Sequence, residues 1–206
     1  GGNGAGKSTL LRMMAGLIDP QSGSVLVDSL SLSQIDAIDR RRQIGYLPQS
    51  VALFQGTLRD NLLLDHGLHS DDELLEALDA VGLGTFVRRH VRGLDLMLQG
   101  NANVSGGQRQ SIGLARVLLQ DPRIVLLDEP TSAFDHVTEN KVIAHMKDWL
   151  KSRTTIISTH KRELLALTDR AVVLKDGRVA RDGDLLNILN TARANAVQKK
   201  PVQAVT

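Results

Sequence analysis

The chain opens with Gly1-Gly2-Asn3-Gly4-Ala5-Gly6-Lys7-Ser8-Thr9, and this stretch decides the fold. Its glycine spacing and its Lys-Ser pair are typical of a phosphate-binding loop. Glycines let the backbone curl so that successive N–H groups point at phosphate oxygens, and the helix that follows adds its positive end. We therefore expect Lys7 to place its charge beside the β- and γ-phosphates and Ser8 to be a ligand of Mg²⁺.

An apolar run further along the chain ends in two acids. Residues 124–127, Ile-Val-Leu-Leu, have the composition of a strand that is covered on both faces, and Asp128 and Glu129 follow directly. A carboxylate at the end of a buried strand can hold a magnesium shell, which suits Asp128. The adjacent Glu129 can polarise a water for attack on a γ-phosphate. A strand that merely ends in acids is the alternative, and the phosphate-binding loop favours the catalytic interpretation.

Strands and helices alternate along the chain, which predicts an α/β fold with a mainly parallel sheet. Lys175-Asp176-Gly177, between two short apolar runs, predicts an antiparallel hairpin. The pattern dissolves at Thr191, so a flexible tail is expected over residues 191–206. The expected strands cover residues 25–27, 44–47, 124–127 and 154–158, and helical patterns cover residues 10–14, 58–120, 137–151 and 162–167.

Composition excludes several classes of protein. The 206 residues carry 25 basic and 23 acidic side chains, a net charge of +2, and no cysteine. The lack of cysteine excludes a disulfide scaffold and a thiolate metal site. Residues 191–206 hold three basic side chains and no acid, so the other residues sum to −1 and give little support for nucleic-acid binding. The longest apolar run, residues 13–18, is far shorter than the roughly 20 residues of a bilayer-spanning helix.

A second anion site is predicted at Val104-Ser105-Gly106-Gly107-Gln108, immediately before an apolar helix. A hydroxyl and exposed N–H groups at the start of a helix favour a bound phosphate. One nucleotide does not need two phosphate sites so far apart in the sequence. A head-to-tail dimer does need them, because each subunit then completes the site of the other.

With these motifs the sequence resembles, over essentially its whole length, the nucleotide-binding domain of ATP-binding cassette (ABC) transporters. The resemblance implies a P-loop NTPase fold, with residues 1–190 as the ATPase domain and a helical subdomain inserted at residues 50–120. It also implies ATP and Mg²⁺ as cofactors. Residues 1–9 match the Walker A loop, residues 124–129 match the Walker B strand, and residues 104–108 match the signature.

The resemblance assigns roles to further residues. Gln49 matches the Q-loop glutamine, which contacts Mg²⁺ and the attacking water, and His160 matches the switch histidine, which contacts the γ-phosphate. The catalytic residues are then Glu129, His160 and Gln49, and the metal ligands are Ser8, Gln49 and Asp128. Asp135 matches the D-loop. The residues expected to bind the nucleotide are Gly1, Gly2, Asn3, Gly4, Ala5, Gly6, Lys7, Ser8, Thr9, Ser105, Gly106, Gly107, Gln108 and Asp135.

Residues 53–61 resemble the exporter-type segment on which a coupling helix of the membrane domain docks. Residues 93–116 and 158–161 are most similar to bacterial type I protein-secretion exporters. Val104 and Phe134 stand where the family usually has Leu. Gln99 stands where its exporters usually have Glu, which affects a contact across the dimer but not ATP binding.

The function implied is an ATP-hydrolysing motor that drives transmembrane export through a dimer with two composite ATP sites. The implied partners are a second nucleotide-binding domain and a transmembrane domain fused upstream, which would hold the chain at the cytoplasmic face of the plasma (inner) membrane. Nucleic acid is not expected as a partner. Because a phosphate-binding loop should follow a buried strand, we expect the sequence to be a fragment of a longer polypeptide. Two alternatives stay open: a soluble ABC ATPase acting on nucleic acid or ribosomes, and a fragment without catalytic activity.

Overall fold

The computed structural model describes residues 2, 4–64 and 68–198. The backbone separates into two compact units. Unit 1 consists of residues 1–7 and 160–206, and unit 2 consists of residues 8–159.

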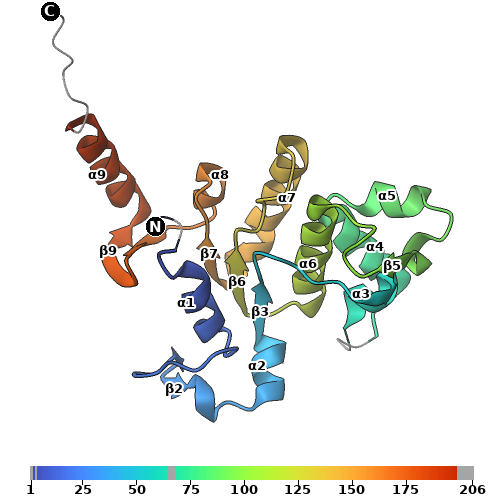
Figure 1. The fold of residues 1–206 in the computed structure, drawn as a ribbon, viewed down its shortest axis with the longest axis horizontal. Coiled ribbons are helices and arrows are strands. Elements are labelled where there is room, and N and C mark those ends of the chain that lie inside the picture. Colours follow the sequence, from blue (N-terminus) through green and yellow to red (C-terminus); the bar gives the residue numbers. More distant parts are fainter. Residues whose placement is uncertain (1, 3, 65–67, 199–206) are drawn as a thin grey trace, which may run out of the picture. The chain divides into compact units, whose positions relative to one another are not determined.

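A parallel sheet lies at the centre of unit 2 (Figure 1). Within the described residues its order is β3 (Ile44–Leu47), β6 (Ile124–Asp128) and β7 (Thr154–Ser158). The register pairs Leu47 with Leu127 and Asp128 with Ser158. Because parallel strands run in one direction, their carboxyl ends meet at the same edge of the sheet, and Asp128 lies at that edge.

Helices cover both faces of this sheet. On one face, Leu11 of α1 (Lys7–Met14) packs with Ile44 and Leu126. On the other face, α6 (Gly106–Gln120) approaches β3 so closely that a Cβ added to Gly45 would lie 3.1 Å from Val117 Cγ1. Burial on both faces explains the continuous apolar run of β6. Helix α7 (His136–Trp149), which leads toward β7, buries Val142 and Met146 and ends in the 3₁₀ turn Leu150–Ser152.

Two short antiparallel ribbons accompany the parallel sheet. Strands β1 (Leu26–Val27) and β2 (Leu30–Ser31) form the first, and the 3₁₀ turn Leu32–Gln34 and α2 (Ala37–Gln43) follow. Strand β4 (Gln55–Thr57) pairs with β5 (Met97–Gln99) to form the second. The stretch predicted to be helical, residues 58–120, therefore contains a strand that its sequence pattern does not indicate.

The remainder of that stretch is mostly helical. Helices α3 (Leu58–Leu63), α4 (Asp71–Ala80) and α5 (Gly84–Arg89) precede the 3₁₀ turn Gly93–Asp95 and α6. Capping boxes begin α3 at Thr57 and α4 at Ser70. In each box the cap side chain accepts a backbone N–H three residues later, and the acid at that position accepts the N–H of the cap residue. The apolar sides of α3 and α4 meet α6 in a core that includes the fully buried Leu62, Leu74, Leu78 and Leu114.

Unit 1 contains the predicted hairpin. Strands β8 (Arg170–Lys175) and β9 (Arg178–Asp184) are antiparallel, with Asp176 and Gly177 at φ of 50° and 73° in the turn between them. Two left-handed residues are what a type I′ hairpin turn requires. The short helix α8 (Arg162–Leu165) precedes the hairpin and α9 (Leu185–Gln198) follows it. A flexible tail was expected from Thr191, but the chain is helical up to Gln198, because its alanines favour a helix. Residues 199–206 lie outside the described residues.

Candidate active site

The phosphate-binding loop begins unit 1 and curls as its glycines predict. Gly2 and residues 4–7 are described, whereas Gly1 and Asn3 lie outside the described residues. Gly4 and Gly6 have φ of +75° and +93°, in the left-handed region that favours glycine. Lys7 Nζ donates to the Gly2 carbonyl at 3.1 Å, so the lysine side chain folds back over its own loop.

Helix α1 begins directly after the loop, at Lys7. Ser8 and Thr9 lie in its first turn, where backbone N–H groups have no partner within the helix and the helix end carries a partial positive charge. The Ser8 side chain is partly buried and Thr9 is exposed. This geometry suits a phosphate, as the sequence predicts.

Asp128 and Glu129 lie at the carboxyl end of β6, the middle strand of the described sheet. Both are buried, with exposed fractions of 2% and 7%. Glu129 has a φ of 49°, which is uncommon for a residue with a side chain, and its N–H donates to the Ser158 carbonyl at 2.8 Å. The chain therefore turns sharply at Glu129, immediately after the strand.

The structure brings Gln49 to the same edge of the sheet. Gln49 is exposed and follows β3, the strand that pairs with β6 in parallel register. His160 is also exposed and follows β7, but it belongs to unit 1 together with Lys7. The approach of Lys7 and His160 to the two acids stays a prediction.

The oxygen atoms at this edge fit a magnesium ion. Mg²⁺ in phosphate-transfer sites usually takes one or two carboxylates, together with phosphate oxygens and several waters in an octahedral shell. Asp128 supplies one buried carboxylate, and the Ser158 Oγ opposite it is buried without a hydrogen-bond partner among the described residues. The same residues contain no group of three or more His, Asp or Glu side chains that could enclose a metal ion alone.

The signature residues begin helix α6. Ser105 is its N-cap: Oγ accepts the Gln108 N–H at 3.1 Å, and the Gln108 side chain accepts the Ser105 N–H at 2.9 Å. Gly106 and Gly107 occupy the first turn, with Gly106 exposed and Gly107 partly buried. The capping box satisfies the Ser105 and Gln108 N–H groups, and those of Gly106 and Gly107 remain at the positive end of a long helix.

Asp135 caps helix α7. Its Oδ1 accepts the N–H groups of Val137 and Thr138 at 3.0 Å each, and its Oδ2 accepts the Thr138 hydroxyl at 2.7 Å. The bonds to Thr138, followed by that to Val137, hold the pKa of Asp135 below its usual range. The described structure thus gives Asp135 a capping role, and its contact with a nucleotide stays a prediction.

Two further residues on α6, Gln110 and Arg116, make hydrogen bonds to other segments of unit 2, and the sequence motifs gave neither of them a role. Gln110 is 3% exposed and bonds to the backbone of Glu129, and Arg116 donates to the carbonyls of Asn61 and Ala52 in the segment after Gln49. Both are polar residues within an apolar helix. That position is a signal in itself, because buried polar groups are nearly always bonded to something specific.

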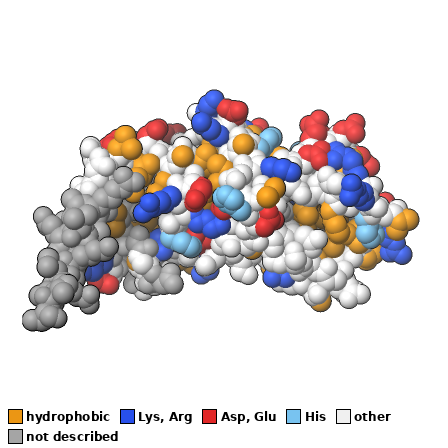
Figure 2. Space-filling model, turned by 90° about the horizontal axis from the view of Figure 1, so that it is seen from above, with side chains coloured by type: hydrophobic (Ala, Val, Ile, Leu, Met, Phe, Trp, Pro, Cys, Tyr) orange, Lys and Arg blue, Asp and Glu red, His pale blue; other side chains and the backbone are white. Residues whose placement is uncertain are grey.

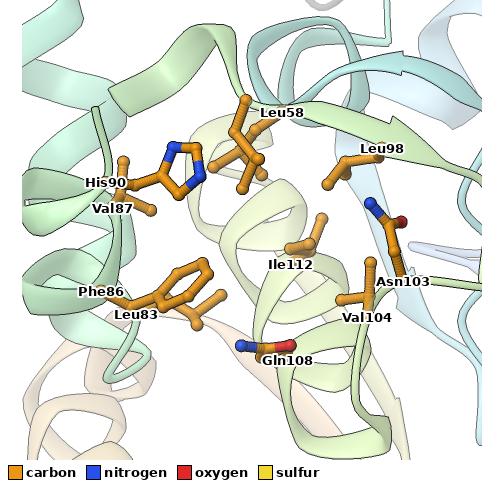
Figure 3. A pocket seen from close by; sticks show the side chains of 11 residues that line it. Leu58, Leu83, Phe86, Val87, His90, Leu98, Asn103, Val104, Gln108 and Ile112 are labelled. Carbon is orange, nitrogen blue, oxygen red and sulfur yellow. The ribbon is translucent and has the colours of Figure 1, made fainter. Parts of the chain in front are cut away.

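A pocket of about 210 Å³ lies beside α6 in the helical part of unit 2. Figure 3 shows Phe86 and His90 on one side of it, facing Ile112 and Gln108 of α6. The lining is mainly apolar and includes the signature residues Val104 and Gln108, but no residue of the phosphate-binding loop. The pocket is therefore not the phosphate site that the sequence predicts.

Basic and acidic side chains are mixed on the face that Figure 2 shows. Among the described residues, ion pairs join Arg59 to Asp71 and Arg88 to Asp79, both at 2.5 Å. The hydrogen bonds within each pair lower the pKa of the aspartate and raise that of the arginine. In the part of the chain that is described, no helix has the length and apolar character needed to span a bilayer.

The family model for ABC transporters matches residues 1–132. The chain belongs to the ABC transporter family. A solved bacterial Atm1-family ABC exporter with ATP bound superimposes with a TM-score of 0.88 and 31% identity, covering 97% of this chain and 36% of that one. The expected fold is confirmed. The expected resemblance of the chain to the ATPase domains of exporter-type ABC transporters is also confirmed.

Curated ABC transporter relatives share about a third of their aligned residues with this chain. The cyclolysin secretion/processing ATP-binding protein CyaB of Bordetella pertussis is 37% identical over 203 residues, which cover 96% of this chain and 28% of CyaB. The mitochondrial iron-sulfur clusters transporter ABCB7 of Homo sapiens is 34% identical over 184 residues, which cover 89% of this chain and 24% of ABCB7. The chain thus spans less than a third of the length of these two relatives.

Proposed function

We propose that this ABC transporter domain is the ATP-hydrolysing motor of an exporter and that it works as a head-to-tail dimer. The observation that carries the proposal is the pair of buried acids, Asp128 and Glu129, at the carboxyl end of the central strand β6. In this proposal residues 1–190 form the ATPase domain, and the helical subdomain covers residues 50–120.

Glu129 is the general base of the proposed reaction. The water oxygen attacks the γ-phosphorus, its proton passes to the Glu129 carboxylate, and the bond from the γ-phosphorus to the bridging oxygen breaks to give ADP and phosphate. Lys7 balances charge on the β- and γ-phosphates, and His160 contacts the γ-phosphate. The sharp turn at Glu129 supports this role, because strained backbone at a buried acid is typical of functional sites.

Ser8, Gln49 and Asp128 are the proposed ligands of Mg²⁺, which would neutralise charge on the β- and γ-phosphates when bound. The buried Asp128 carboxylate has the chemistry that this ion prefers. The exposed position of Gln49 at the same edge of the sheet supports its role as a ligand.

The second phosphate contact comes from the partner domain. Ser105, Gly106 and Gly107 present the positive end of α6, and they would contact the ATP held by the phosphate-binding loop of the other subunit. Gln108 stabilises this end through the capping box, and Asp135 stabilises the start of α7 beside the same interface.

The proposed export role concerns a longer protein, of which this chain would be the ATPase domain. The names of CyaB and ABCB7 describe secretion and transport, which favours a transporter over a soluble ABC ATPase that acts on nucleic acid. In the proposal, a fused transmembrane domain contacts the segment after Gln49 and holds the motor at the cytoplasmic face of the inner membrane. The resemblance of residues 93–116 and 158–161 favours type I protein secretion as the form of export, and the name of CyaB includes the secretion of cyclolysin.

The test is a Glu129→Gln variant, which keeps the size of the side chain and removes the base. It should bind ATP with the affinity of the parent protein and lose steady-state hydrolysis. Phosphate release and nucleotide titration measure the two quantities separately. Turnover close to that of the parent protein would remove Glu129 from the proposed role.

A further inference from the structure

Gln110 ties the signature helix to the backbone of the proposed catalytic acid. It lies in the second turn of α6, and its side chain is 3% exposed. Its Nε2 donates to the Glu129 carbonyl at 2.7 Å and to Ser132 Oγ at 3.2 Å, and its Oε1 accepts the Ala133 N–H at 2.8 Å. One amide therefore fixes the segment 129–133 at three atoms and uses both its donor and its acceptor sides.

The backbone that Gln110 fixes is strained. Glu129 has a φ of 49°, a conformation that persists only where the surroundings over-determine it. Its N–H is bonded to the Ser158 carbonyl of β7, and its carbonyl receives the Gln110 amide from α6. The Ser132 N–H also donates to the Glu129 carbonyl, at 3.1 Å. Both the N–H and the carbonyl of Glu129 are thus hydrogen-bonded, and Gln110 is the residue of α6 that makes one of these bonds.

The same helix begins at the signature. Ser105 caps α6, and Gln110 follows within the continuous helical ladder of residues 106–120. A continuous helix is a rigid element, so a displacement of its first turn carries its second turn with it. A ligand that pulls on Ser105 would therefore also move the Gln110 amide and, through it, the Glu129 carbonyl.

We propose that Gln110 is a positioning residue that couples the signature to Glu129 within one subunit. This inference rests on the proposed function: Ser105–Gly107 contact the ATP of the partner, while Glu129 acts on the ATP of its own subunit. Gln110 then links the two composite sites, so that the catalytic acid is set correctly once the signature is occupied.

The experiment compares Gln110→Met with Gln120→Met in the protein with its native partner domains. Met has the length of Gln and cannot make these hydrogen bonds. Gln120 is a matched control on the same helix, since its Nε2 also donates to two backbone carbonyls, those of Arg41 and Ile44, far from Glu129 in the sequence. Gln110→Asn, which keeps the amide on a shorter side chain, is the second variant should Gln110→Met fail to fold.

Gln110→Met should lower kcat for ATP hydrolysis by about 10- to 100-fold, the range expected when a catalytic group is misplaced, and leave the ATP dissociation constant unchanged. The Hill coefficient for ATP should fall toward one. Gln120→Met should leave both quantities near those of the parent protein, even if its melting temperature falls equally. Equal kcat for the parent protein and Gln110→Met, or equal losses in Gln110→Met and Gln120→Met, would overturn the inference.

Amide hydrogen exchange separates this inference from the proposed function. The Ala133 N–H donates to Gln110, so exchange in residues 130–135 should be faster in Gln110→Met and unchanged in Gln120→Met, whether or not nucleotide is present. Unchanged exchange in Gln110→Met would refute the positioning role. A parent protein that does not hydrolyse ATP would instead overturn the proposed function and, with it, the coupling.

Discussion

Arg116 should stabilise the fold even though its charge is largely buried. Its guanidinium donates to the Asn61 carbonyl at 2.6 Å, to the Ala52 carbonyl at 3.0 Å and to Asn61 Oδ1 at 3.1 Å. Asn61 lies in the last turn of α3, where carbonyls lack helical partners, so Arg116 also caps that helix. The structure gives no carboxylate as partner in these three bonds, and burial lowers the pKa of Arg116 to about 10.

The size of the effect follows from two opposed terms. The lowered pKa corresponds to a desolvation cost of about 2–3 kcal/mol, once partial exposure is allowed for. Three hydrogen bonds from a charged donor contribute about 1.5–3 kcal/mol each, or about 4.5–9 kcal/mol together. The hydrogen bonds outweigh the desolvation cost, and Arg116→Met should lower the free energy of unfolding by about 1.5–7 kcal/mol.

Urea denaturation, followed by the fluorescence of Trp149, the single tryptophan, measures this change. Arg89→Met makes the same substitution at an exposed arginine of α5 and should shift stability by no more than about 0.5 kcal/mol. Arg116→Lys should fall between Met and the parent protein, because one ammonium cannot reproduce the fork. A loss below about 1 kcal/mol in Arg116→Met would mean that desolvation cancels the hydrogen bonds, and the reasoning would fail.

Three further substitutions test separate parts of the account. Lys7→Ala should weaken ATP binding in a nucleotide titration, since it deletes the mobile cation of the loop; unchanged affinity would contradict a phosphate site there. Ser29→Gly should raise the melting temperature by about 2–4 °C, because Ser29 has a φ of 71°, whereas Ser50→Gly, outside the left-handed region, should not. Asp135 stabilises α7 above its unfolded pKa near 3.8, and this contribution is lost as pH falls through its lower folded pKa, so Asp135→Asn should melt with a shallower pH dependence from about pH 5 to 2. Parallel pH profiles for Asp135→Asn and the parent protein would exclude that contribution.

The parallel sheet and its flanking helices could be predicted because their sequence signals are long and uninterrupted. The run 124–127 is apolar at every position, since both faces of β6 are covered, and the structure places β6 at residues 124–128. Residues 44–47 end at Pro48, which cannot donate in a ladder, and β3 ends where that rule predicts. The hairpin at Asp176-Gly177 has the sequence of the turn that the structure shows.

The short antiparallel ribbons could not be predicted in the same way. Strand β1 lies within the strand expected at residues 25–27, but its partner β2 has only two residues, too few to show an alternating pattern. The turn between them holds Asp28 and Ser29 at φ of 48° and 71°. The sequence Asp-Gly would have predicted such a turn, whereas Asp28-Ser29 does not. Strands β4 and β5 pair across a long stretch of helix, and their partnership is set by tertiary contacts rather than by local pattern.

The sequence marks candidate site residues where a motif places their chemistry in consecutive positions, and marks them less clearly where a side chain acts through the backbone. Gln110 and Arg116 donate hydrogen bonds to backbone carbonyls, which every residue has, so no partner residue type can be recognised in the sequence. Only their polar character within an apolar helix indicates a role. Asp135 shows the converse. A family motif assigns it to the nucleotide, and the described structure engages its carboxylate in a cap.

In the proposed dimer, each ATP lies between the phosphate-binding loop of one subunit and the signature of the other. Mixing two inactive variants tests this arrangement. Lys7→Ala destroys the loop, and Ser105→Arg blocks the signature with a bulky cation while leaving the chain's own loop intact. A mixed dimer then holds one composite site with both lesions and one with neither.

The rate of phosphate release is measured for each variant alone and for the mixture at equal total concentration. With composite sites, either variant alone should show almost no hydrolysis, and the mixture should show a clear recovery, with at most one working site per dimer. If the mixture hydrolyses no more ATP than its components, or if Ser105→Arg alone is fully active, the composite site is refuted.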